Sequence, residues 1–324
     1  MLPLADAAKQ LGIPRPTLQG WLRRAGERPT VVQGLPVSVA HIPDVDDIED
    51  LIDARKRAFK RRAAHEAATK LIEVNIDIGG PVGILHFGDP HVDDDGTDIQ
   101  ALEDHTELCR TTEGLFAANV GDTTNNWVGR LARLYSEQAT TAKQAWMLAE
   151  WFIKRCRWLY MVGGNHDDWS GAGDPLKWIA RQSAAVHQSS EARMALKFPN
   201  GRKVIVNARH DFAGGSQWNP VHAPMKAVQM GLRDHISICG HKHKSGYGVL
   251  KDPESGRTCH AIQVASYKVY DRYAKEKGFR DQALGPSVTT VIDPKLADND
   301  PGLVQVFWNP HEAAEFLKWK RKRK

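Results

Sequence analysis

The sequence has few cysteines and no long apolar run, and each shortage narrows the class of protein. Its four cysteines lie far apart without a CxxC pair, which is typical of unpaired thiols in a reducing compartment. No apolar stretch reaches the roughly 18 residues that a membrane span requires. The N-terminus has no charged head followed by an apolar middle, so no signal peptide is indicated. We therefore expect a soluble, cytoplasmic protein without a membrane partner.

A strong net charge is also missing. The 324 residues include 44 Lys and Arg against 39 Asp and Glu, a formal net charge of +5, which is too mild for a protein that wraps nucleic acid as a whole. Basic residues gather instead at 55–62 and at 318–324, where phosphate contacts, a solvated helix face or a frayed tail would each explain them. The length and the 41% hydrophobic content allow one large α/β domain with a small appendage.

The first 25 residues predict two short helices, at 4–11 and 16–24, around a turn at Gly12. The stretch AAKQLGIPRPTLQGWLRR resembles the helix-turn-helix of bacterial and phage DNA-binding proteins, whose second helix enters the major groove. A helical hairpin that packs on a neighbour or on a partner protein would show the same pattern. The resemblance implies DNA as a partner, a bacterial cell or a phage-infected host as the location, and DNA contacts by Arg15, Gln19, Arg23 and Arg24.

Four segments follow from composition and periodicity. Residues 1–43 form the helix-turn-helix-like module, which ends in a Gly- and Pro-rich loop or small β-wing, and 44–70 form a linker helix. Residues 71–310 form the main domain, and 311–324 form a basic C-terminal tail. In the main domain, apolar strand-like runs alternate with helical patterns, which predicts layered α/β architecture. The expected strands are 71–78, 82–89, 114–120, 158–162, 203–208, 235–239, 259–267 and 287–292, and the expected helices are 98–113, 138–157 and 175–187.

Short polar clusters follow five of these strands. Polar loops at strand ends are where α/β folds build their sites, so clusters far apart in sequence can converge. Taken singly each signal is weak, since an HxH or a GD recurs by chance and a lone aspartate often caps a helix. In order, the clusters are Asp89-Pro90-His91, Gly121-Asp122-Thr123-Thr124-Asn125, Gly164-Asn165-His166-Asp167, His210-Asp211 and Gly240-His241-Lys242-His243.

This ordered set resembles the calcineurin-like metallophosphoesterase superfamily. Its signature runs D-x-H, GDxxD or GDxxN, GNH followed by D or E, a lone H, and GHxH, and every element is present between residues 82 and 293. The resemblance implies an α/β fold in which a two-layer β-sandwich is flanked by helices, beside a small all-α N-terminal module. It also implies two divalent metals at the sheet edge. Asn125 replaces the commoner aspartate at a position that is not a metal ligand.

The resemblance assigns a role to each matching residue. A hydroxide that bridges the metals would attack phosphorus, His166 would protonate the leaving group, and Asp167 would orient the His166 imidazole. Carboxylate oxygens and imidazole nitrogens suit Mn²⁺, which we favour, as well as Fe or Zn²⁺. Asp89, His91 and His243 would hold one metal, Asn165, His210 and His241 the other, and Asp122 would bridge both.

Other conspicuous residues leave alternatives open. Residues 93–95, three aspartates, could support the ligands, but a solvated loop is the favoured interpretation. Trp127 and Trp169 could wall the cleft or stack a base, and core packing would explain them equally well. Residues 266–282 mix aromatic and basic side chains, as a nucleic-acid groove or an ordinary amphipathic segment would.

The leading hypothesis is a two-metal phosphodiesterase or nuclease that acts on DNA, with the N-terminal module delivering it there. One alternative is a phosphatase or phosphodiesterase for a small molecule or a phosphoprotein. Another is an inactive DNA-binding scaffold, against which the complete ligand set argues.

Overall fold

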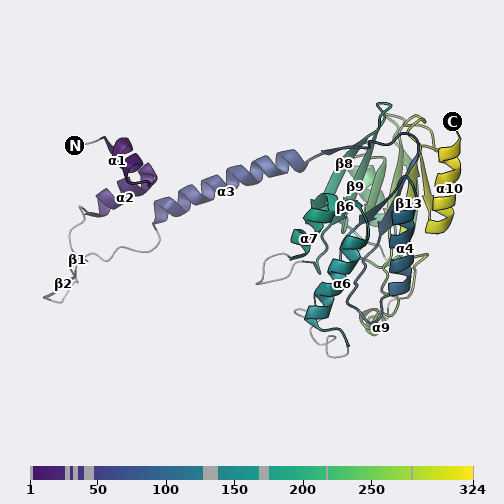
Figure 1. Ribbon diagram of the computed structural model, residues 1–324, viewed down its shortest axis with the longest axis horizontal. Coiled ribbons are helices and arrows are strands. Elements are labelled where there is room, and N and C mark those ends of the chain that lie inside the picture. Colours follow the sequence, from purple (N-terminus) through teal and green to yellow (C-terminus); the bar gives the residue numbers. More distant parts are fainter. Residues whose placement is uncertain are drawn as a thin grey trace. The chain divides into compact units, whose positions relative to one another are not determined.

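The computed structural model divides the chain into two compact units, Met1–Lys70 and Leu71–Lys324 (Figure 1). In the described segments, no helix has both the length and the apolar character needed to span a bilayer. The structure describes residues 3–25, 30–31, 36–39, 47–126, 138–167, 175–216, 218–278 and 280–323.

The N-terminal unit contains the two expected helices, α1 (Leu4–Gln10) and α2 (Arg15–Ala25). Gly12 joins them with a φ of +65°, a left-handed conformation that favours glycine. Of the two alternatives for the following residues, a loop or a small β-wing, the structure has the β-wing, because β1 (Thr30–Val31) and β2 (Ser38–Val39) pair as a short antiparallel ribbon beside the two helices. The linker helix is α3 (Ile48–Thr69), which begins where the Asp47 carboxylate accepts a hydrogen bond from the Glu49 backbone N–H.

The second unit is built on two mixed six-stranded sheets. The first sheet has the strand order β14 (Val304–Phe307), β13 (Ser287–Ile292), β4 (Val82–Phe87), β5 (Leu115–Asn119), β6 (Trp158–Val162) and β7 (Ala184–Gln188). The second sheet has the order β11 (Gly246–Lys251), β12 (Thr258–Gln263), β10 (Ile236–Cys239), β9 (Lys203–Arg209), β8 (Glu191–Lys197) and β3 (Ile72–Asn75). Strands β4 to β7 are parallel in the first sheet, and β9, β10 and β12 are parallel in the second.

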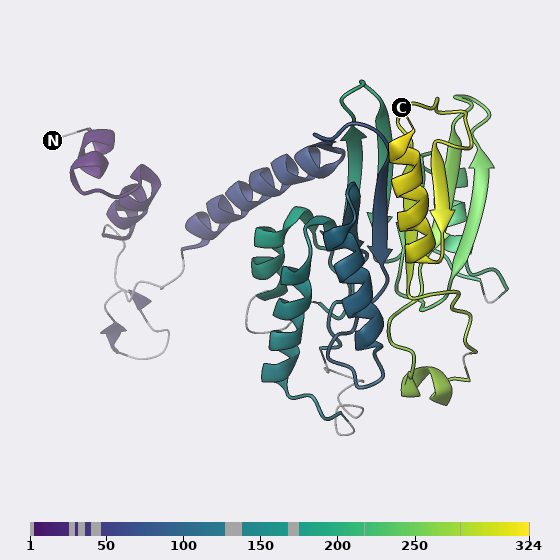
Figure 2. The same ribbon diagram turned by 45° about the vertical axis from the view of Figure 1, so that its right-hand side comes forward.

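The two sheets pack face to face, and helices cover the outer faces. Buried side chains of both sheets form one apolar cluster, in which Ile84 and Tyr160 of the first sheet join Val206 and Ile238 of the second. The helices α4 (Ile99–Thr111), α6 (Ala142–Arg155) and α10 (Pro310–Lys322) cover the other face of the first sheet, side by side in Figure 2. Helix α8 (His222–Met230) packs on the second sheet. The expected two-layer β-sandwich flanked by helices is therefore confirmed.

Two expected elements are wrong. Helix α7 (Pro175–Ser183) ends before residue 187, because 184–188 pair with β6 as the edge strand β7, whose Val186 joins the apolar cluster between the sheets. Residues 311–322 are part of α10 and do not form a basic tail. Asn309 caps this helix, Pro310 opens it, and Leu317 is fully buried against the first sheet.

Acid sensitivity follows from a histidine in the middle of the sandwich. His86 of β4 is fully buried, with its Nδ1 2.6 Å from the Tyr160 hydroxyl and its Nε2 2.9 Å from the Thr290 Oγ1. Burial lowers the pKa of His86 to about 3, whereas an unfolded histidine titrates near pH 6.5. Below about pH 6.5 the unfolded chain therefore binds a proton that the folded chain excludes, and stability falls as the pH falls.

We expect this residue alone to remove about 2.5 kcal/mol of the unfolding free energy between pH 7.5 and pH 4.5. Urea unfolding of the wild type and of His86→Gln across this range would measure it. The variant starts less stable but should lose less with acidification, because glutamine does not titrate. Parallel pH profiles for the two proteins would contradict the prediction.

Candidate metal centre

The expected ligands meet at the carboxyl ends of five strands. Strands β4, β5 and β6 are parallel neighbours in the first sheet, and β9 and β10 are parallel neighbours in the second. The loop after each strand therefore emerges at one end of the sandwich. The residues that these loops supply are Asp89 and His91 after β4, Asp122 after β5, Asn165 and His166 after β6, His210 after β9, and His241 and His243 after β10.

One group of donor atoms gathers around His91, and we call it the first ligand group. The His91 Nε2 lies 3.2 Å from the His243 Nε2 and 4.0 Å from the Asp122 Oδ2. The Asp89 Oδ2 lies 3.4 Å from the His243 Nε2. Asp89, His91 and Asp122 are all buried, so these donors face one another away from bulk water. Two nitrogens and two carboxylates converging in this way suit a transition-metal ion.

A second ligand group gathers around His210. Its Nε2 lies 2.9 Å from the Asn165 Oδ1, 3.1 Å from the His241 Nδ1 and 3.2 Å from the Asp122 Oδ2. The His210 Nδ1–H donates to the Val120 carbonyl at 3.0 Å, so a neutral ring turns its Nε2 lone pair to the other donors. Asp122 Oδ2 borders both groups, which is the position that a bridging carboxylate needs.

The buried carboxylates of the centre favour a bound cation. Burial raises the pKa of Asp89 well above its usual range, and its Oδ1 has no hydrogen-bond partner among the described residues. Burial also lowers the pKa of His210, but the hydrogen bond and charge of Asp122 outweigh it and raise the pKa to about 10. The buried Asp122 carboxylate therefore favours a positive charge beside it, and a proton on His210 is one source of that charge. A divalent cation would supply it instead and leave the imidazole free to coordinate, so the donor set fits metal ions.

The backbone is strained where the ligands lie. In the described part of the chain, six non-glycine residues have a positive φ, and five of them are expected ligands. Such conformations are costly and concentrate at functional sites, where the surrounding packing enforces them. These five residues and their φ values are Asp89 (26°), His91 (40°), Asp122 (48°), His241 (71°) and His243 (48°).

Two motif glycines are needed for close approach to the carboxylates. A Cβ on Gly164 would lie 2.0 Å from the Asp122 Oδ1, and one on Gly240 would lie 2.4 Å from the Asp89 Oδ1. No real side chain tolerates such contacts, so any substitution would push the neighbouring carboxylate aside. The glycines of GNH and GHxH therefore let the loops reach the ligand carboxylates.

His166 lies at the edge of the centre without occupying a ligand position. Its Nδ1 is 2.5 Å from the Asn125 carbonyl oxygen, to which it donates its proton, and its Nε2 lies 3.9 Å from the Asp122 Oδ2. The side chain is 19% exposed, whereas the adjoining His91 is buried. The Nε2 therefore faces the centre from a position that a substrate can reach.

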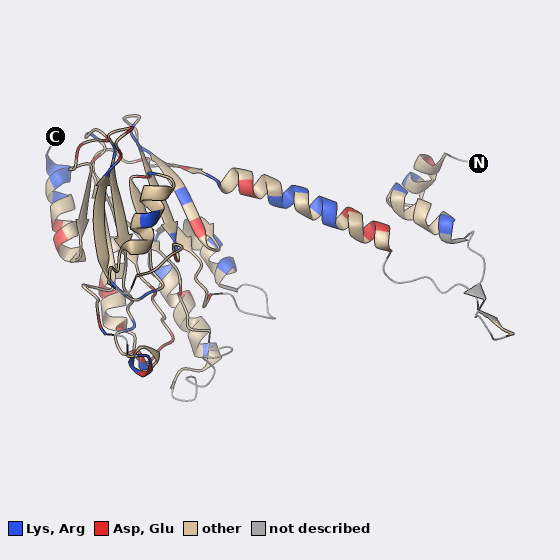
Figure 3. Ribbon diagram, turned by 180° about the vertical axis from the view of Figure 1, so that it is seen from behind, with Lys and Arg blue, Asp and Glu red and all other residues tan. Residues whose placement is uncertain are grey.

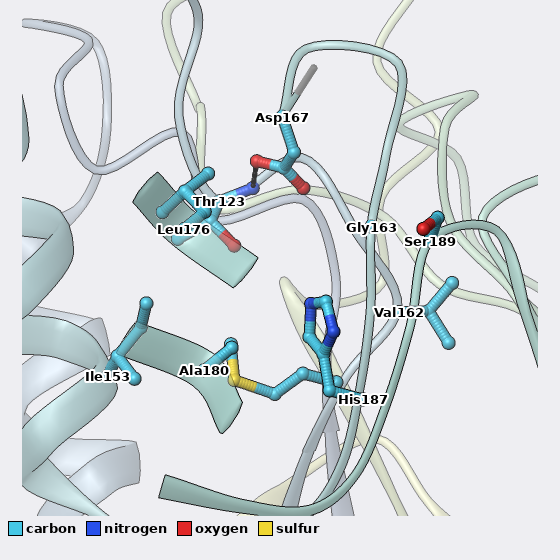
Figure 4. A pocket seen from close by; sticks show the side chains of 10 residues that line it. Thr123, Ile153, Val162, Gly163, Asp167, Leu176, Ala180, His187 and Ser189 are labelled. Carbon is cyan, nitrogen blue, oxygen red and sulfur yellow. Dashed lines mark hydrogen bonds between the residues drawn. The ribbon is translucent and has the colours of Figure 1, made fainter. Parts of the chain in front are cut away.

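The prediction that Asp167 orients the His166 imidazole is wrong, because the Asp167 carboxylate has other partners. The Asp167 carboxylate accepts hydrogen bonds from the backbone N–H groups of Thr123, Thr124 and Gly164, at 2.9, 3.3 and 2.8 Å. Figure 4 shows it beside Thr123 on a small cavity of about 20 Å³, enough for about one water molecule. Asp167 thus ties the loop after β6 to the loop after β5, and the Asn125 carbonyl orients His166 in its place.

The interpretation of residues 93–95 as a solvated loop is wrong for Asp93 and Asp94, which are buried, and holds only for the exposed Asp95. The Asp93 Oδ1 accepts hydrogen bonds from the Asn125 backbone N–H at 2.7 Å and from its side-chain amide at 3.3 Å. The Asp94 Oδ2 accepts a hydrogen bond from the Asn125 side-chain amide at 3.2 Å and lies 2.8 Å from the Lys268 Nζ. These aspartates therefore fix Asn125, and through its carbonyl they fix His166.

The expected DNA contacts lie on α2, and their role stays a prediction. Arg15, Gln19 and Arg23 are exposed, and the Arg23 guanidinium pairs with the Glu49 carboxylate at 2.9 Å. The side chain of Arg24, like Trp127 and Trp169, lies outside the described residues.

No family model and no curated protein matches this chain. Solved structures similar to it include an archaeal phosphodiesterase (13% identity, 70% of this chain and 99% of that chain, TM-score 0.36). The NAD nucleotidase NadN of Haemophilus influenzae is 10% identical over 70% of this chain and 49% of its own, with a TM-score of 0.35. The calcineurin-like phosphoesterase YfkN of Bacillus subtilis is 12% identical over 75% of this chain and 99% of its own, with a TM-score of 0.33. What the chain does is therefore inferred from its own residues at the strand ends.

Proposed function

We propose that the protein is a two-metal phosphodiesterase of the calcineurin-like metallophosphoesterase type, and that its substrate is DNA. The observation that carries this proposal is the shared position of Asp122 between two groups of nitrogen and oxygen donors. A bridging carboxylate holds two cations close enough to act on one phosphoryl group.

The residues of the two ligand groups divide the work of holding the metals. Asp89, His91 and His243 would hold one ion, with Asp122 as the shared ligand. Asn165, His210 and His241 would hold the other. Bound divalent ions, with Mn²⁺ favoured over Fe or Zn²⁺, lower the pKa of water and neutralise charge on the phosphoryl oxygens.

His166 would act as the general acid. The Asn125 carbonyl holds its Nδ1–H, so the protonated ring presents the Nε2–H to the leaving oxygen. When the P–O bond breaks, this proton passes to the leaving alkoxide and the ring becomes neutral with its Nδ1–H still in place. The buried Asp93 and Asn125 keep the ring in this orientation.

Features of the N-terminal unit support DNA as the substrate. Arg15, Gln19 and Arg23 of α2 are exposed. Lys and Arg follow one another along α3 (Figure 3). Cations on exposed helices bind the phosphate backbone whatever the sequence. The cations on α3 are Arg55, Lys56, Arg57, Lys60, Arg61 and Arg62, all exposed.

Hydrolysis by the Mn²⁺-loaded full chain tests the proposal with an aryl phosphodiester, an aryl phosphomonoester and linear DNA, the DNA both as a single strand and as a duplex, where cleavage of either form counts as DNA hydrolysis. We expect the diester and DNA to be hydrolysed, and the double variant Arg15→Ala/Gln19→Ala to cleave DNA about 10-fold more slowly at physiological salt. The aryl diester is the control, because it is too small to depend on α2. Hydrolysis of the monoester alone would indicate a phosphatase. A fully metal-loaded protein without any hydrolysis would indicate a scaffold.

A further inference from the structure

Two aromatic side chains project into solvent from loops that are fixed to the metal centre. Trp218 is 93% exposed and Tyr270 is 73% exposed. A single exposed aromatic residue is ordinary, but these two belong to the loops at the carboxyl ends of β9 and β12, next to the ligand loops. Their positions point to a ligand that carries flat rings beside a phosphodiester.

The backbone of Tyr270 is held against the loop that carries His91. The backbone N–H groups of Val269 and Tyr270 donate to the Gly96 carbonyl at 2.9 and 3.2 Å. The approach is so close that a Cβ on Gly96 would lie 2.1 Å from the Tyr270 carbonyl oxygen. The next residue, Asp271, has its Oδ2 3.7 Å from the His243 Nδ1. The first ligand group therefore has an exposed ring on a fixed backbone beside it.

Trp218 lies on the loop that leaves the centre at His210. Lys242, between the two histidines of the GHxH motif, reaches this loop, with its Nζ 3.1 Å from the Asp211 Oδ1 and 3.5 Å from the Gly214 carbonyl oxygen. The Trp218 backbone N–H donates to the Ser216 Oγ at 3.1 Å, which organises the turn that presents the indole. The second ligand group is thus bordered by a loop with its own exposed ring.

We propose that the centre takes single-stranded nucleic acid, with unpaired bases stacked on Trp218 and Tyr270 to either side of the phosphodiester at Asp122. This inference rests on the proposed phosphodiesterase function and adds the class of substrate. In a duplex the base faces are covered by their neighbours, so rings that stand free in solvent stack only on unpaired bases. A mononucleotide would offer a base to one ring only.

The test compares cleavage and binding by the full chain with Trp218→Ala and Tyr270→Ala. The substrates are the 12-mers dT12 and rU12, a 12-base-pair duplex and an aryl phosphodiester. We expect each variant to bind and cleave the single strands about 10- to 100-fold more weakly, as the loss of one stacked base predicts. Tyr270→Phe and Trp218→Phe keep a flat ring and should restore most of the affinity. Trp319→Ala removes a 46% exposed indole from α10 and should change nothing.

The outcomes separate the two proposals. The inference is supported if the alanine variants lose binding and cleavage of dT12, of rU12 or of both. A preference of the wild type for one of the two strands identifies the sugar that is accepted. The single-strand inference is overturned if the duplex is cut as well as the single strands, or if alanine at either position leaves single-strand binding unchanged. Failure of the metal-loaded wild type to hydrolyse the aryl diester would instead reject the phosphodiesterase function. Both rings lie outside the core, and thermal unfolding of each variant verifies that the fold is kept.

Discussion

Asp122→Asn is expected to lower kcat/KM for any phosphodiester about 1,000-fold or more and to reduce the metal content to one ion or fewer per chain. Asparagine can keep the hydrogen bond that the Asp122 Oδ1 accepts from the His166 backbone N–H. The other atom becomes an N–H₂ group, a donor that cannot coordinate, at the position that borders both ligand groups. The charge that joins the two groups is lost while the shape of the loop is retained.

Metal analysis after gel filtration and steady-state kinetics with excess Mn²⁺ would measure both effects. Asp77→Asn makes the same chemical change at an exposed aspartate outside the centre and should leave both quantities unchanged. A variant that keeps two ions and near wild-type turnover would show that Asp122 does not bridge. Loss of metal without loss of turnover would refute the two-metal proposal itself.

The ligand loops could be predicted from sequence because each one combines two local signals. An apolar run such as VGILHF predicts a buried strand, and the polar residues that follow must lie where that strand ends. Parallel strands then bring these ends to one edge of the sheet. The order of the motifs along the chain groups Asp89 and His91 with the other expected ligands. Taken alone, neither residue could be told apart from one that only caps a helix or a strand.

The supporting residues could not be predicted, because partners distant in sequence determine their burial. Asp93, Asp94 and Asp95 are chemically identical neighbours, yet two are buried and one is exposed. Asn125 and Lys268 create the difference, and both come from other loops. Asp167 is a similar case, since its adjacency to His166 suggested a contact that the backbone N–H groups of other loops take instead.

Several strands were missed because tertiary pairing overrides their composition. Residues 191–197, EARMALK, are rich in helix formers, but they form β8 between β3 and β9 with Met194 and Leu196 fully buried. Strand β11 has an alternating, half-exposed pattern with glycines at 246 and 248, which resembles a loop until β12 pairs with it. A strand at a sheet edge needs little apolar sequence when one neighbour fixes it.

His166→Ala is expected to slow hydrolysis about 1,000-fold for esters with a poor leaving group and about 10-fold or less for p-nitrophenyl esters. An alkoxide leaving from DNA needs a proton as the P–O bond breaks, whereas p-nitrophenolate is stable without one. His166 is outside the two ligand groups, so the metal content should stay at the wild-type value. The dependence on leaving group, measured with a series of aryl and alkyl diesters, distinguishes a proton donor from a residue that only shapes the site.

Asn125 offers the matched variant for this test, because it supports the ring through its backbone. Asn125→Asp removes the side-chain amide that donates to Asp93 and Asp94 and places a third carboxylate beside these two buried ones. The Asn125 carbonyl should then shift and misalign the His166 ring. We therefore expect the hydrolysis of esters with a poor leaving group to slow about 10- to 100-fold.

Two outcomes would contradict these predictions. If His166→Ala slows all esters equally, His166 stabilises the phosphoryl group and another group protonates the leaving oxygen. An unaltered Asn125→Asp would show that the ring is oriented without the buried aspartates.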